Sequence, residues 1–348
     1  GVTGCSDSRR IDMTLSSDRI TLFSFGSIVR TDRSTLKQAL KSSSRENWIE
    51  AISEEFESLQ EADTWKIVDL PPPGKRIFPS KFVLKIKHNS DRTIERYKAR
   101  LVLLGHLQQK DIDFFETYSP VVDFTAVRIA LAIACQMEMT THHLDVKCAF
   151  LYGTIDEEIY MRLPEEYAYS DGKVCRLKKS IYGLKQAPRA WNAHLMKDLK
   201  SIGYIPFMHA ESIFWRYKDD IKVYLLVYVD DFLLITSAKS PKIISNLKDE
   251  IASFYTIKDL GQAEYFQGIN LEHSAHSIKL SQSAYIHKIL DRFNMAECKV
   301  VVSPMLSHDN LFDKRLATEK EKLLMLNVSY REAIGALMFL SVRRRPDI

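Results

Sequence analysis

The sequence predicts an α+β fold, because strand hairpins and amphipathic helices occur in the same chain. Residues 222–237 form an apolar run rich in β-branched and aromatic side chains, which is typical of strands, and Asp230 and Asp231 interrupt it. The run predicts two strands joined by a tight turn at the aspartate pair. Apolar residues at helical intervals over 43–62 predict a helix, and residues 81–103 predict a second strand pair.

The composition indicates a globular protein. The chain has 348 residues, 45% of them hydrophobic, which is enough for a core in two or three subdomains. No apolar run approaches the ~20 residues that a membrane span needs. The five cysteines are widely spaced and form no CxxC pair, which favours a reducing compartment and argues against structural zinc. Because the chain starts at Gly1 and stops in an arginine-rich segment, we expect it to be a piece of a longer protein.

The net charge of +4 is unevenly distributed. Residues 81–110 carry eight Lys or Arg against two acids, and residues 173–197 carry seven with no acid, so the remaining chain is acidic. Segregation of this kind is what a groove for a polyanion requires. A solvated basic face is the alternative for either window alone.

Local patterns place the other elements. Residues 1–42 show no period and predict a poorly ordered leader. Ser43 and Glu46 have the spacing of a capping box, so the first long helix is expected to begin at Ser43 and end near Ala62. The further expected elements, in chain order, are strands 81–87 and 93–103 with a turn near 89–92, helix 127–137, a short strand ending at Asp145, a basic loop 176–191 entering a helix that runs to Gly203, helix 242–254, a compact β element 259–280, helix 282–293, a charged linker 304–327 and helix 330–340.

Arg96, Lys98 and Arg100 alternate with apolar residues in the second basic strand. The period of two puts the three cations on one face. A polar face on a hairpin is ordinary, but three cations without interleaved acids also suit a flap that binds phosphates.

The aspartates are the candidates for chemistry. Two adjacent carboxylates in a core hairpin repel each other and need water or a cation, and carboxylate oxygens are the ligands that Mg²⁺ prefers. A solvated surface turn is the alternative for the pair alone. Asp145, at the end of its own short strand, is a third carboxylate in a similar setting. His142 and His143 lack the spacing of a zinc site, which favours a structural role. Gln186, in the basic loop, can donate and accept hydrogen bonds to a base or sugar.

Several motifs occur together in one order. They are RYKARLV (96–102), TYSPVV (117–122), DVKCAFL (145–151), YGLKQAPRAW (182–191), YVDD (228–231), YFQGI (265–269) and RRPDI (344–348). From about Trp48 to Ile348 the chain resembles the reverse transcriptase of a copia-type LTR retrotransposon, within its Pol polyprotein.

This resemblance implies a right-handed polymerase fold of fingers, palm and thumb, with an antiparallel β-sheet palm backed by helices. The expected division is a leader at 1–42, fingers and palm at 43–240, the palm end, a primer-grip-like element and the thumb at 241–303, and a linker towards a ribonuclease H domain at 304–348. It also implies an RNA- and DNA-directed DNA polymerase that adds dNTPs to a primer 3′-hydroxyl. The resemblance further implies a cytoplasmic protein in virus-like particles, with nuclear intermediates, and no membrane association.

The resemblance also assigns roles to residues. Asp145, Asp230 and Asp231, with the carbonyl of Val146, would hold two Mg²⁺ ions, for which Mn²⁺ can substitute. Phe150 would lie under the sugar and exclude a 2′-hydroxyl, with an ordinary core phenylalanine as the alternative. Further nucleotide contacts would come from Gln186, Lys87, Arg96, Lys98 and Arg100, and primer or template contacts from Tyr228, Lys185, Arg189, Tyr265, Phe266, Gln267 and Gly268, with residues 282–293 as a thumb helix.

The implied partners are an RNA template, a DNA or tRNA primer, dNTPs, and the integrase and ribonuclease H domains of the polyprotein. Three stretches depart from the usual family pattern: Phe82, residues 103–106 and residues 207–213. A decayed element that binds nucleic acid without polymerising is therefore one alternative. A purely structural nucleic-acid-binding protein is another alternative, but the negative charges of three carboxylates would weaken its binding to phosphates.

Overall fold

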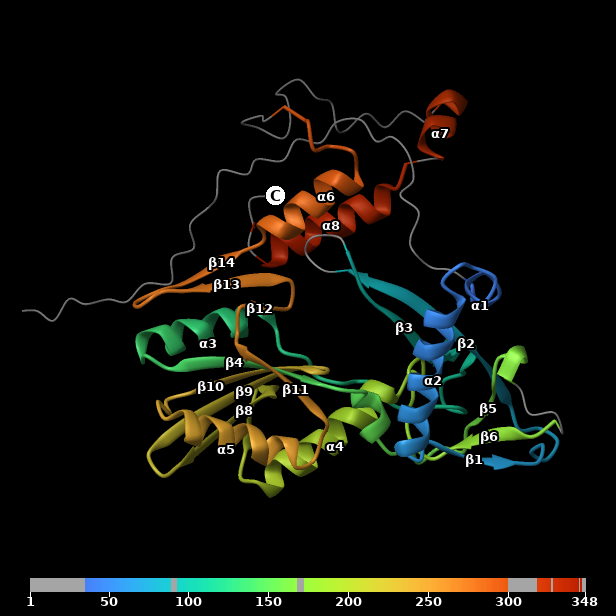
Figure 1. Cartoon of the computed structure of the whole chain (residues 1–348), viewed down its shortest axis with the longest axis horizontal. Coiled ribbons are helices and arrows are strands. Elements are labelled where there is room, and N and C mark those ends of the chain that lie inside the picture. Colours follow the sequence, from blue (N-terminus) through green and yellow to red (C-terminus); the bar gives the residue numbers. More distant parts are fainter. Residues whose placement is uncertain are drawn as a thin grey trace, which may run out of the picture. The chain divides into compact units, whose positions relative to one another are not determined.

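The computed structural model describes residues 35–88, 93–167, 172–299, 318–326, 328–343 and 345 (Figure 1). Its helices and three β-sheets confirm the predicted α+β class. The predicted turn at 89–92, most of the leader and residues 304–317 of the linker lie outside the described residues. Within the described parts of the expected leader and linker, residues form α1 (Leu36–Ala39) and α7 (Glu319–Met325), each with a capping box. No helix in the described residues is long and apolar enough to span a membrane.

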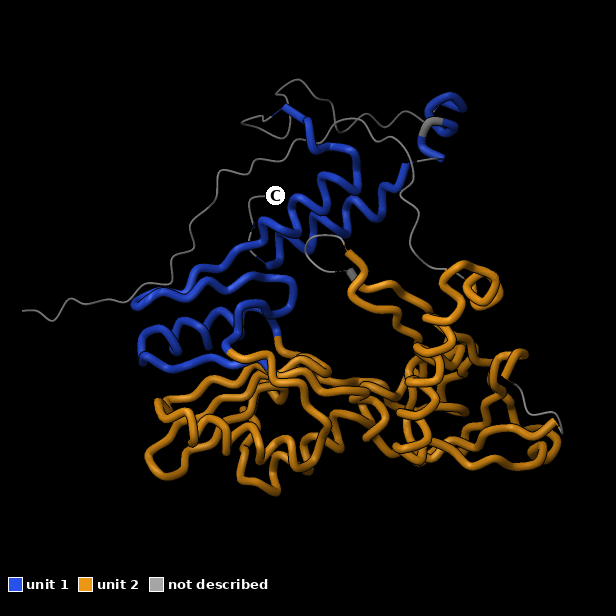
Figure 2. The backbone as a smooth tube through the Cα atoms, in the orientation of Figure 1, with its two compact units in different colours: residues 1–31, 123–143, 262–348 blue, residues 32–122, 144–261 orange. Residues whose placement is uncertain are grey.

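The described chain divides into two compact units (Figure 2). One holds residues 35–122 and 144–261, and the other holds residues 123–143 and those from 262 onward. The units interleave along the chain, whereas the segments 43–240 and 241–303 expected from the motifs are contiguous. The helix at 124–136 belongs with the carboxyl-terminal elements because of contacts between residues far apart in sequence. Local sequence patterns do not predict such contacts.

A five-stranded sheet in the first unit carries the basic strand pair. Its order is β1-β6-β5-β2-β3, and only the β2–β5 pair is parallel among the registers of its strands. Its strands are β1 (Trp65–Val68), β2 (Ile77–His88), β3 (Ile94–Leu103), β5 (Tyr160–Arg162) and β6 (Val174–Leu177). In β3, Ala99 and Leu101 are buried while the cations alternate with them, so the predicted alternation is confirmed.

Helix α2 (Arg45–Glu61) packs on this sheet through Trp48, Ile52 and Leu59, as its spacing predicts. The predicted capping box at Ser43 is wrong: the helix begins one residue later, after Ser44, which makes no side-chain capping bond. Ser44 instead accepts the hydroxyl of Tyr97 at 3.0 Å, so a contact with β3 takes the place of the cap.

The six-stranded sheet carries the aspartate hairpin. Its order is β11-β4-β10-β9-β8-β7, with β4 (Thr140–Val146), β7 (Ile205–Phe207), β8 (Ala210–Lys218), β9 (Ile221–Tyr228), β10 (Asp231–Thr236) and β11 (Ile257–Gln262). Helices α4 (Ala187–Ser201) and α5 (Pro241–Ala252) pack on it through an apolar core that includes Trp191, Phe214 and Phe232. Alternation along the strands places every second side chain in this core.

In the described residues, the second unit contains a three-stranded sheet and four helices. The sheet is β12 (Tyr265–Phe266), β13 (Ile269–His273) and β14 (Ile278–Ser281), and the helices are α3 (Phe124–Gln136), α6 (Ser283–Arg292), α7 and α8 (Tyr330–Arg343). Helices α6 and α8 share a small core of Ile286, Ile289, Ala333 and Leu340. Short 3₁₀ turns at Gly105–Leu107, Ala149–Tyr152 and Glu165–Tyr167 complete the described elements of the chain.

Candidate active site

The aspartate hairpin differs in one respect from its prediction. The turn between β9 and β10 consists of Val229 and Asp230, because Asp231 is the first residue of β10 and pairs with Tyr228. The predicted turn at Asp230 and Asp231 is therefore shifted by one residue. Val229 has a left-handed φ of 57°, which a β-branched residue rarely adopts, so the backbone of this turn is strained.

Asp145 is brought to this hairpin by the backbone. The N–H of Val146, the residue after Asp145, donates to the carbonyl of Asp230 at 2.8 Å. The next N–H, of Lys147, donates to the carbonyl of Thr256 at 2.9 Å. Backbone bonds thus hold the end of β4 at Val146 and Lys147, and they place the segment that carries Asp145 beside the hairpin that carries Asp230 and Asp231.

The electrostatics of the site follow from this arrangement. Burial raises the pKa of Asp230, and the charges of Asp231 and Asp145 raise it further, while Arg100 opposes them. In the described residues, no group of three or more His, Cys, Asp or Glu side chains is arranged to hold a metal ion. The donor set nevertheless fits a hard divalent cation, because its oxygens are carboxylates whose mutual repulsion such an ion would relieve.

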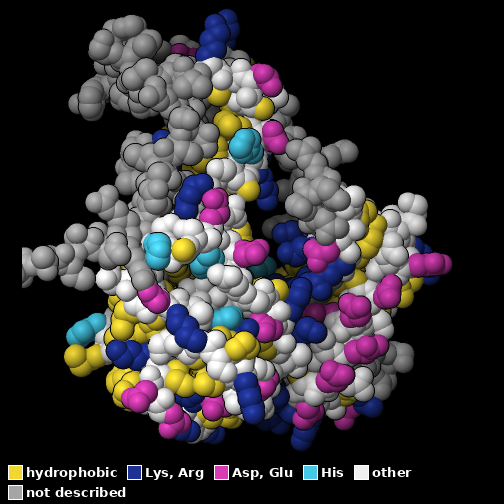
Figure 3. All heavy atoms as spheres, turned by 60° about the vertical axis from the view of Figure 1, so that its left-hand side comes forward, with side chains coloured by type: hydrophobic (Ala, Val, Ile, Leu, Met, Phe, Trp, Pro, Cys, Tyr) yellow, Lys and Arg dark blue, Asp and Glu magenta, His cyan; other side chains and the backbone are white. Residues whose placement is uncertain are grey.

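The cations of the basic strand pair crowd one another. In the register, Lys98 lies opposite Lys85 and Arg96 opposite Lys87. Burial lowers the pKa of Lys98 and of Lys87, and the neighbouring cations lower both further. On the face drawn in Figure 3, a group of Lys and Arg side chains lies near the middle, among scattered side chains of both charges. Such a cluster gains stability from a bound polyanion, as the charge pattern predicts.

Arg100 and Phe150 both contact Tyr182 in the loop before α4. The guanidinium of Arg100 lies 4.1 Å from the ring centroid of Tyr182, and the Phe150 ring meets it edge-on at 5.1 Å. Phe150 is half-buried, and the hydroxyl of Ser180 donates to its carbonyl. Contact with a sugar stays a prediction, but the ring that is expected to make it has a fixed position.

Gln186 is 4% exposed, and its amide group is bonded within the chain. Its Nε2 donates to the carbonyl of Asp113 at 3.1 Å, and its Oε1 accepts from Gln108 at 3.0 Å. A ligand could reach the amide only by replacing these bonds. Lys185 and Arg189 are exposed, and Lys185 also donates to the carbonyl of Gln108 at 3.3 Å.

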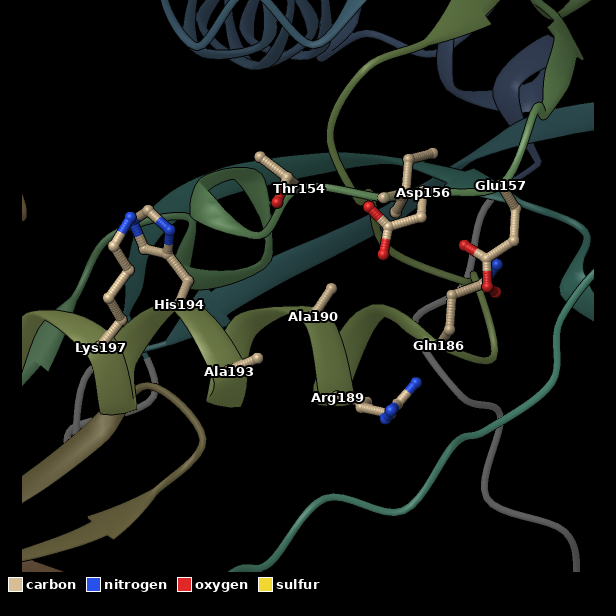
Figure 4. Close-up of a pocket in the computed structure, with 10 residues that line it drawn as sticks. Thr154, Asp156, Glu157, Gln186, Arg189, Ala190, Ala193, His194 and Lys197 are labelled. Atoms are coloured by element: carbon tan, nitrogen blue, oxygen red, sulfur yellow. The ribbon is translucent and has the colours of Figure 1, made fainter.

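A pocket of about 420 Å³ lies along α4 (Figure 4). In Figure 4, Asp156 and Glu157 lie on the segment opposite α4, and His194 and Lys197 come from the helix itself. Of the predicted site residues it includes only Gln186 and Arg189. Because none of the three aspartates lines it, this pocket is not the site that they form.

A family model described as "Reverse transcriptase (RNA-dependent DNA polymerase)" matches residues 62–307. The chain belongs to the reverse transcriptase family. It is 40% identical over 320 residues to the "Retrovirus-related Pol polyprotein from transposon TNT 1-94" of Nicotiana tabacum, covering 90% of this chain and 24% of that protein. It is 36% identical over 316 residues to the corresponding polyprotein from transposon RE1 of Arabidopsis thaliana, covering 90% and 21%.

A further relative is a putative transposon Ty5-1 protein of Saccharomyces cerevisiae, 34% identical over 208 residues, which are 59% of this chain and 65% of that protein. The copia-type resemblance inferred from the motifs is confirmed. The chain spans between a fifth and a quarter of the length of the plant Pol polyproteins it matches.

The segment expected to hold the primer end lies in the second unit. Gln267 and Gly268 both have positive φ and join β12 to β13, as in a two-residue type I′ hairpin. Tyr265 is exposed, but Phe266 is 1% exposed and packs on His143, so its side chain is not free to contact a primer. Gln267 accepts from Arg343 on α8 at 2.5 Å.

Sequence reasoning missed three residues at the first unit's site. Glu55, Gln108 and Trp191 each have a buried side chain that is hydrogen-bonded to a segment carrying predicted site residues. Trp191 lies within the recognised loop motif, but no periodicity or spacing indicates its partner. Only the fold reveals these bonds, because they join residues far apart in the chain.

Proposed function

We propose that this chain is an RNA-directed DNA polymerase that also copies DNA, adding dNTPs to the 3′-hydroxyl of a primer. The observation that supports it most is the bond from the Val146 N–H to the Asp230 carbonyl, because it joins Asp145 to the hairpin of Asp230 and Asp231. Membership of the reverse transcriptase family agrees with this activity.

The three aspartates, with the Val146 carbonyl, are the residues that would hold two Mg²⁺ ions, or Mn²⁺ in their place. Such ions lower the pKa of an attacking hydroxyl and neutralise the charge on a triphosphate and its leaving group. The raised pKa of Asp230 supports this role, since a carboxylate that resists ionisation gains most from a nearby cation.

The chain's own cations and rings orient the nucleotide. Lys87, Arg96, Lys98 and Arg100 present one face of β2 and β3 to the triphosphate. Stacking on Tyr182 holds the Arg100 guanidinium, which makes charge-assisted bonds to phosphate oxygens in a fixed direction. The Phe150 ring, fixed against the same tyrosine, excludes a 2′-hydroxyl and so selects dNTPs over rNTPs.

The remaining assignments follow from the same proposal. The two larger sheets would be the fingers and palm, and α6 with α8 the thumb, of a right-handed polymerase. RNA template, a DNA or tRNA primer, and the integrase and ribonuclease H domains of a Pol polyprotein are the proposed partners. We place the protein in cytoplasmic virus-like particles, with nuclear steps after synthesis of the DNA.

The test is Mg²⁺-dependent dNTP incorporation on oligo(dT)-primed poly(rA). Wild type should extend the primer, and Asp230→Asn should lose incorporation by about a thousandfold or more, because a ligand to the reacting ions is lost. Asp249→Asn, which changes an exposed carboxylate on α5, is the matched control and should extend normally.

One observation favours a second function, nucleic-acid binding without polymerisation. In the described residues, no three carboxylates form a group that could hold a metal ion. A decayed active site would show the same arrangement. If wild type binds primer–template but never extends it, and Asp145→Asn binds equally or more tightly, the binding function replaces the polymerase.

A further inference from the structure

The indole N–H of Trp191 makes its hydrogen bond with the aspartate hairpin. Its indole Nε1–H donates to the carbonyl of Val229 at 2.8 Å, and the side chain is 2% exposed. The ring meets that of Tyr255 at 5.1 Å and that of Tyr152 at 5.9 Å. Tyr255 is itself fixed by a 2.7 Å hydrogen bond from its hydroxyl to Asp198 on α4. The indole therefore has little freedom to turn away from Val229.

The accepted carbonyl belongs to the strained residue of the turn. Val229 has φ of 57°, a conformation that costs a β-branched residue free energy and that hairpins usually give to glycine. Two hydrogen bonds from outside the hairpin hold this turn: Trp191 binds the carbonyl of Val229, and Val146 binds that of Asp230. Strain of this kind persists only where the surroundings hold it.

We propose that the indole N–H of Trp191 is a positioning group for Asp230: it holds the turn in its left-handed conformation, so that the carboxylate faces Asp145. The proposal rests on the proposed function for its catalytic consequence, but the hold on the turn is a property of the chain alone. Without the bond, Val229 relaxes towards a negative φ and carries the Asp230 backbone with it.

Trp191→Phe tests this, because phenylalanine keeps a ring in the core and removes only the N–H and part of the volume. We expect kcat to fall about tenfold, with little change in the KM for primer–template, since misplacing a reacting group by a fraction of an ångström acts on the chemical step. Trp48→Phe, the same change at another buried tryptophan of the same unit, should lower stability comparably and leave kcat within about twofold.

Val229→Gly provides the second arm. Glycine adopts the left-handed conformation without strain, so a turn with glycine needs the indole bond less. In the Val229→Gly background, Trp191→Phe should therefore cost about threefold or less in kcat, a coupling that a double-mutant cycle measures. An equal loss in both backgrounds overturns the proposal, because the effect of Trp191 would then not pass through the turn.

Amide hydrogen exchange gives a readout that needs no activity. Trp191→Phe should speed exchange at residues 229–231 by about tenfold or more, and Trp48→Phe should not. If wild type extends no primer, the proposed function fails while the exchange result still decides the role of Trp191. Unchanged exchange in Trp191→Phe overturns the proposal even if the wild-type enzyme is active.

Discussion

The carboxylate of Glu55 on α2 accepts the backbone N–H of Leu101 on β3, over 2.9 Å. β3 is the outer strand of its sheet, so a donor on its free side has no strand to pair with, and a side chain from a packed helix satisfies it. The same carboxylate lies in the field of Arg100 and Lys98. The buried Glu55 carboxylate thus satisfies a backbone donor at the edge of β3 and lies near the cations that are proposed to bind the nucleotide.

We expect Glu55→Ala to destabilise the protein by about 2 kcal/mol, because it leaves the Leu101 N–H buried without an acceptor. Glu55→Gln keeps an acceptor and should cost less than about 1 kcal/mol. Urea unfolding measures both values. Glu54→Ala, an exposed change on the same helix, should stay within about 0.5 kcal/mol of wild type. Equal losses for the two Glu55 variants would contradict the role given to the Leu101 bond.

Asp230→Asn should stabilise the metal-free protein at pH 7.5, by roughly 1 kcal/mol or less after solvent screening. Burial and the other aspartates raise the pKa of Asp230 in the folded state, so its ionisation opposes folding. The stability that protonated Asp230 contributes is therefore fully present below the usual Asp pKa and is lost as pH rises through the raised value. Thermal unfolding in EDTA from pH 4 to pH 8 should show the two proteins converging at the acid end.

Addition of Mg²⁺ at pH 7.5 should raise the melting temperature of wild type more than that of Asp230→Asn, since a ligand that binds the folded state stabilises it. In the pH series, a higher melting temperature of Asp230→Asn that stays constant from pH 4 to pH 8 would contradict the prediction, because the ionisation of Asp230 would then not be its source.

Replacing Gly183 or Gly335 by alanine should change the stability of the protein in opposite directions. Gly183 has φ of +95°, and a Cβ there would lie 2.0 Å from the carbonyl oxygen of Leu103, so Gly183→Ala should cost about 3 kcal/mol or more. Gly335 lies inside α8 with open space around its Cβ position, so Gly335→Ala should stabilise by about 0.5–1 kcal/mol. Melting curves of the two variants check both signs, and a stable Gly183→Ala would refute the close approach.

Arg343 should matter for primer binding through Gln267. Its guanidinium donates to the Gln267 side chain and lies over the rings of Phe124 and Phe339, at 5.0 and 5.2 Å. Lysine has no planar guanidinium to stack on these rings while it bonds to Gln267. Arg343→Lys should therefore weaken primer–template binding about threefold to tenfold without lowering kcat. Fluorescence anisotropy with a labelled primer–template measures the affinity. Arg331→Lys, on the exposed start of α8, is the control, and equal losses in both variants would remove the special role of Arg343.

Periodic features could be predicted from the sequence alone. The alternation of Ala99 and Leu101 with cations, and the helical spacing of Trp48, Ile52 and Leu59, record burial directly, and the structure has both. The three aspartates could be selected because like charges in apolar runs are costly without a purpose.

Bonds between side chains and distant backbone could not be predicted. Gln186 is a polar residue in a basic loop, which suggests a ligand contact, yet the fold buries its amide against Gln108 and Asp113. The one-residue shift of the hairpin turn has a similar origin, since the bonds from Trp191 and Val146 to the turn come from other elements. Such partners leave no periodic trace in the chain.

The register of the five-stranded sheet also sets an order for folding. Trp65 at the start of β1 pairs with Leu177 in β6, and Ile77 in β2 pairs in parallel with Tyr160 in β5. During translation, one edge of β2 must therefore stay open until β5 has been made to Arg162, and β1 must wait until β6 has been made to Leu177. Non-local pairings of this kind close slowly and expose strands to misassembly. An amino-terminal fragment able to complete this sheet must therefore reach at least Leu177.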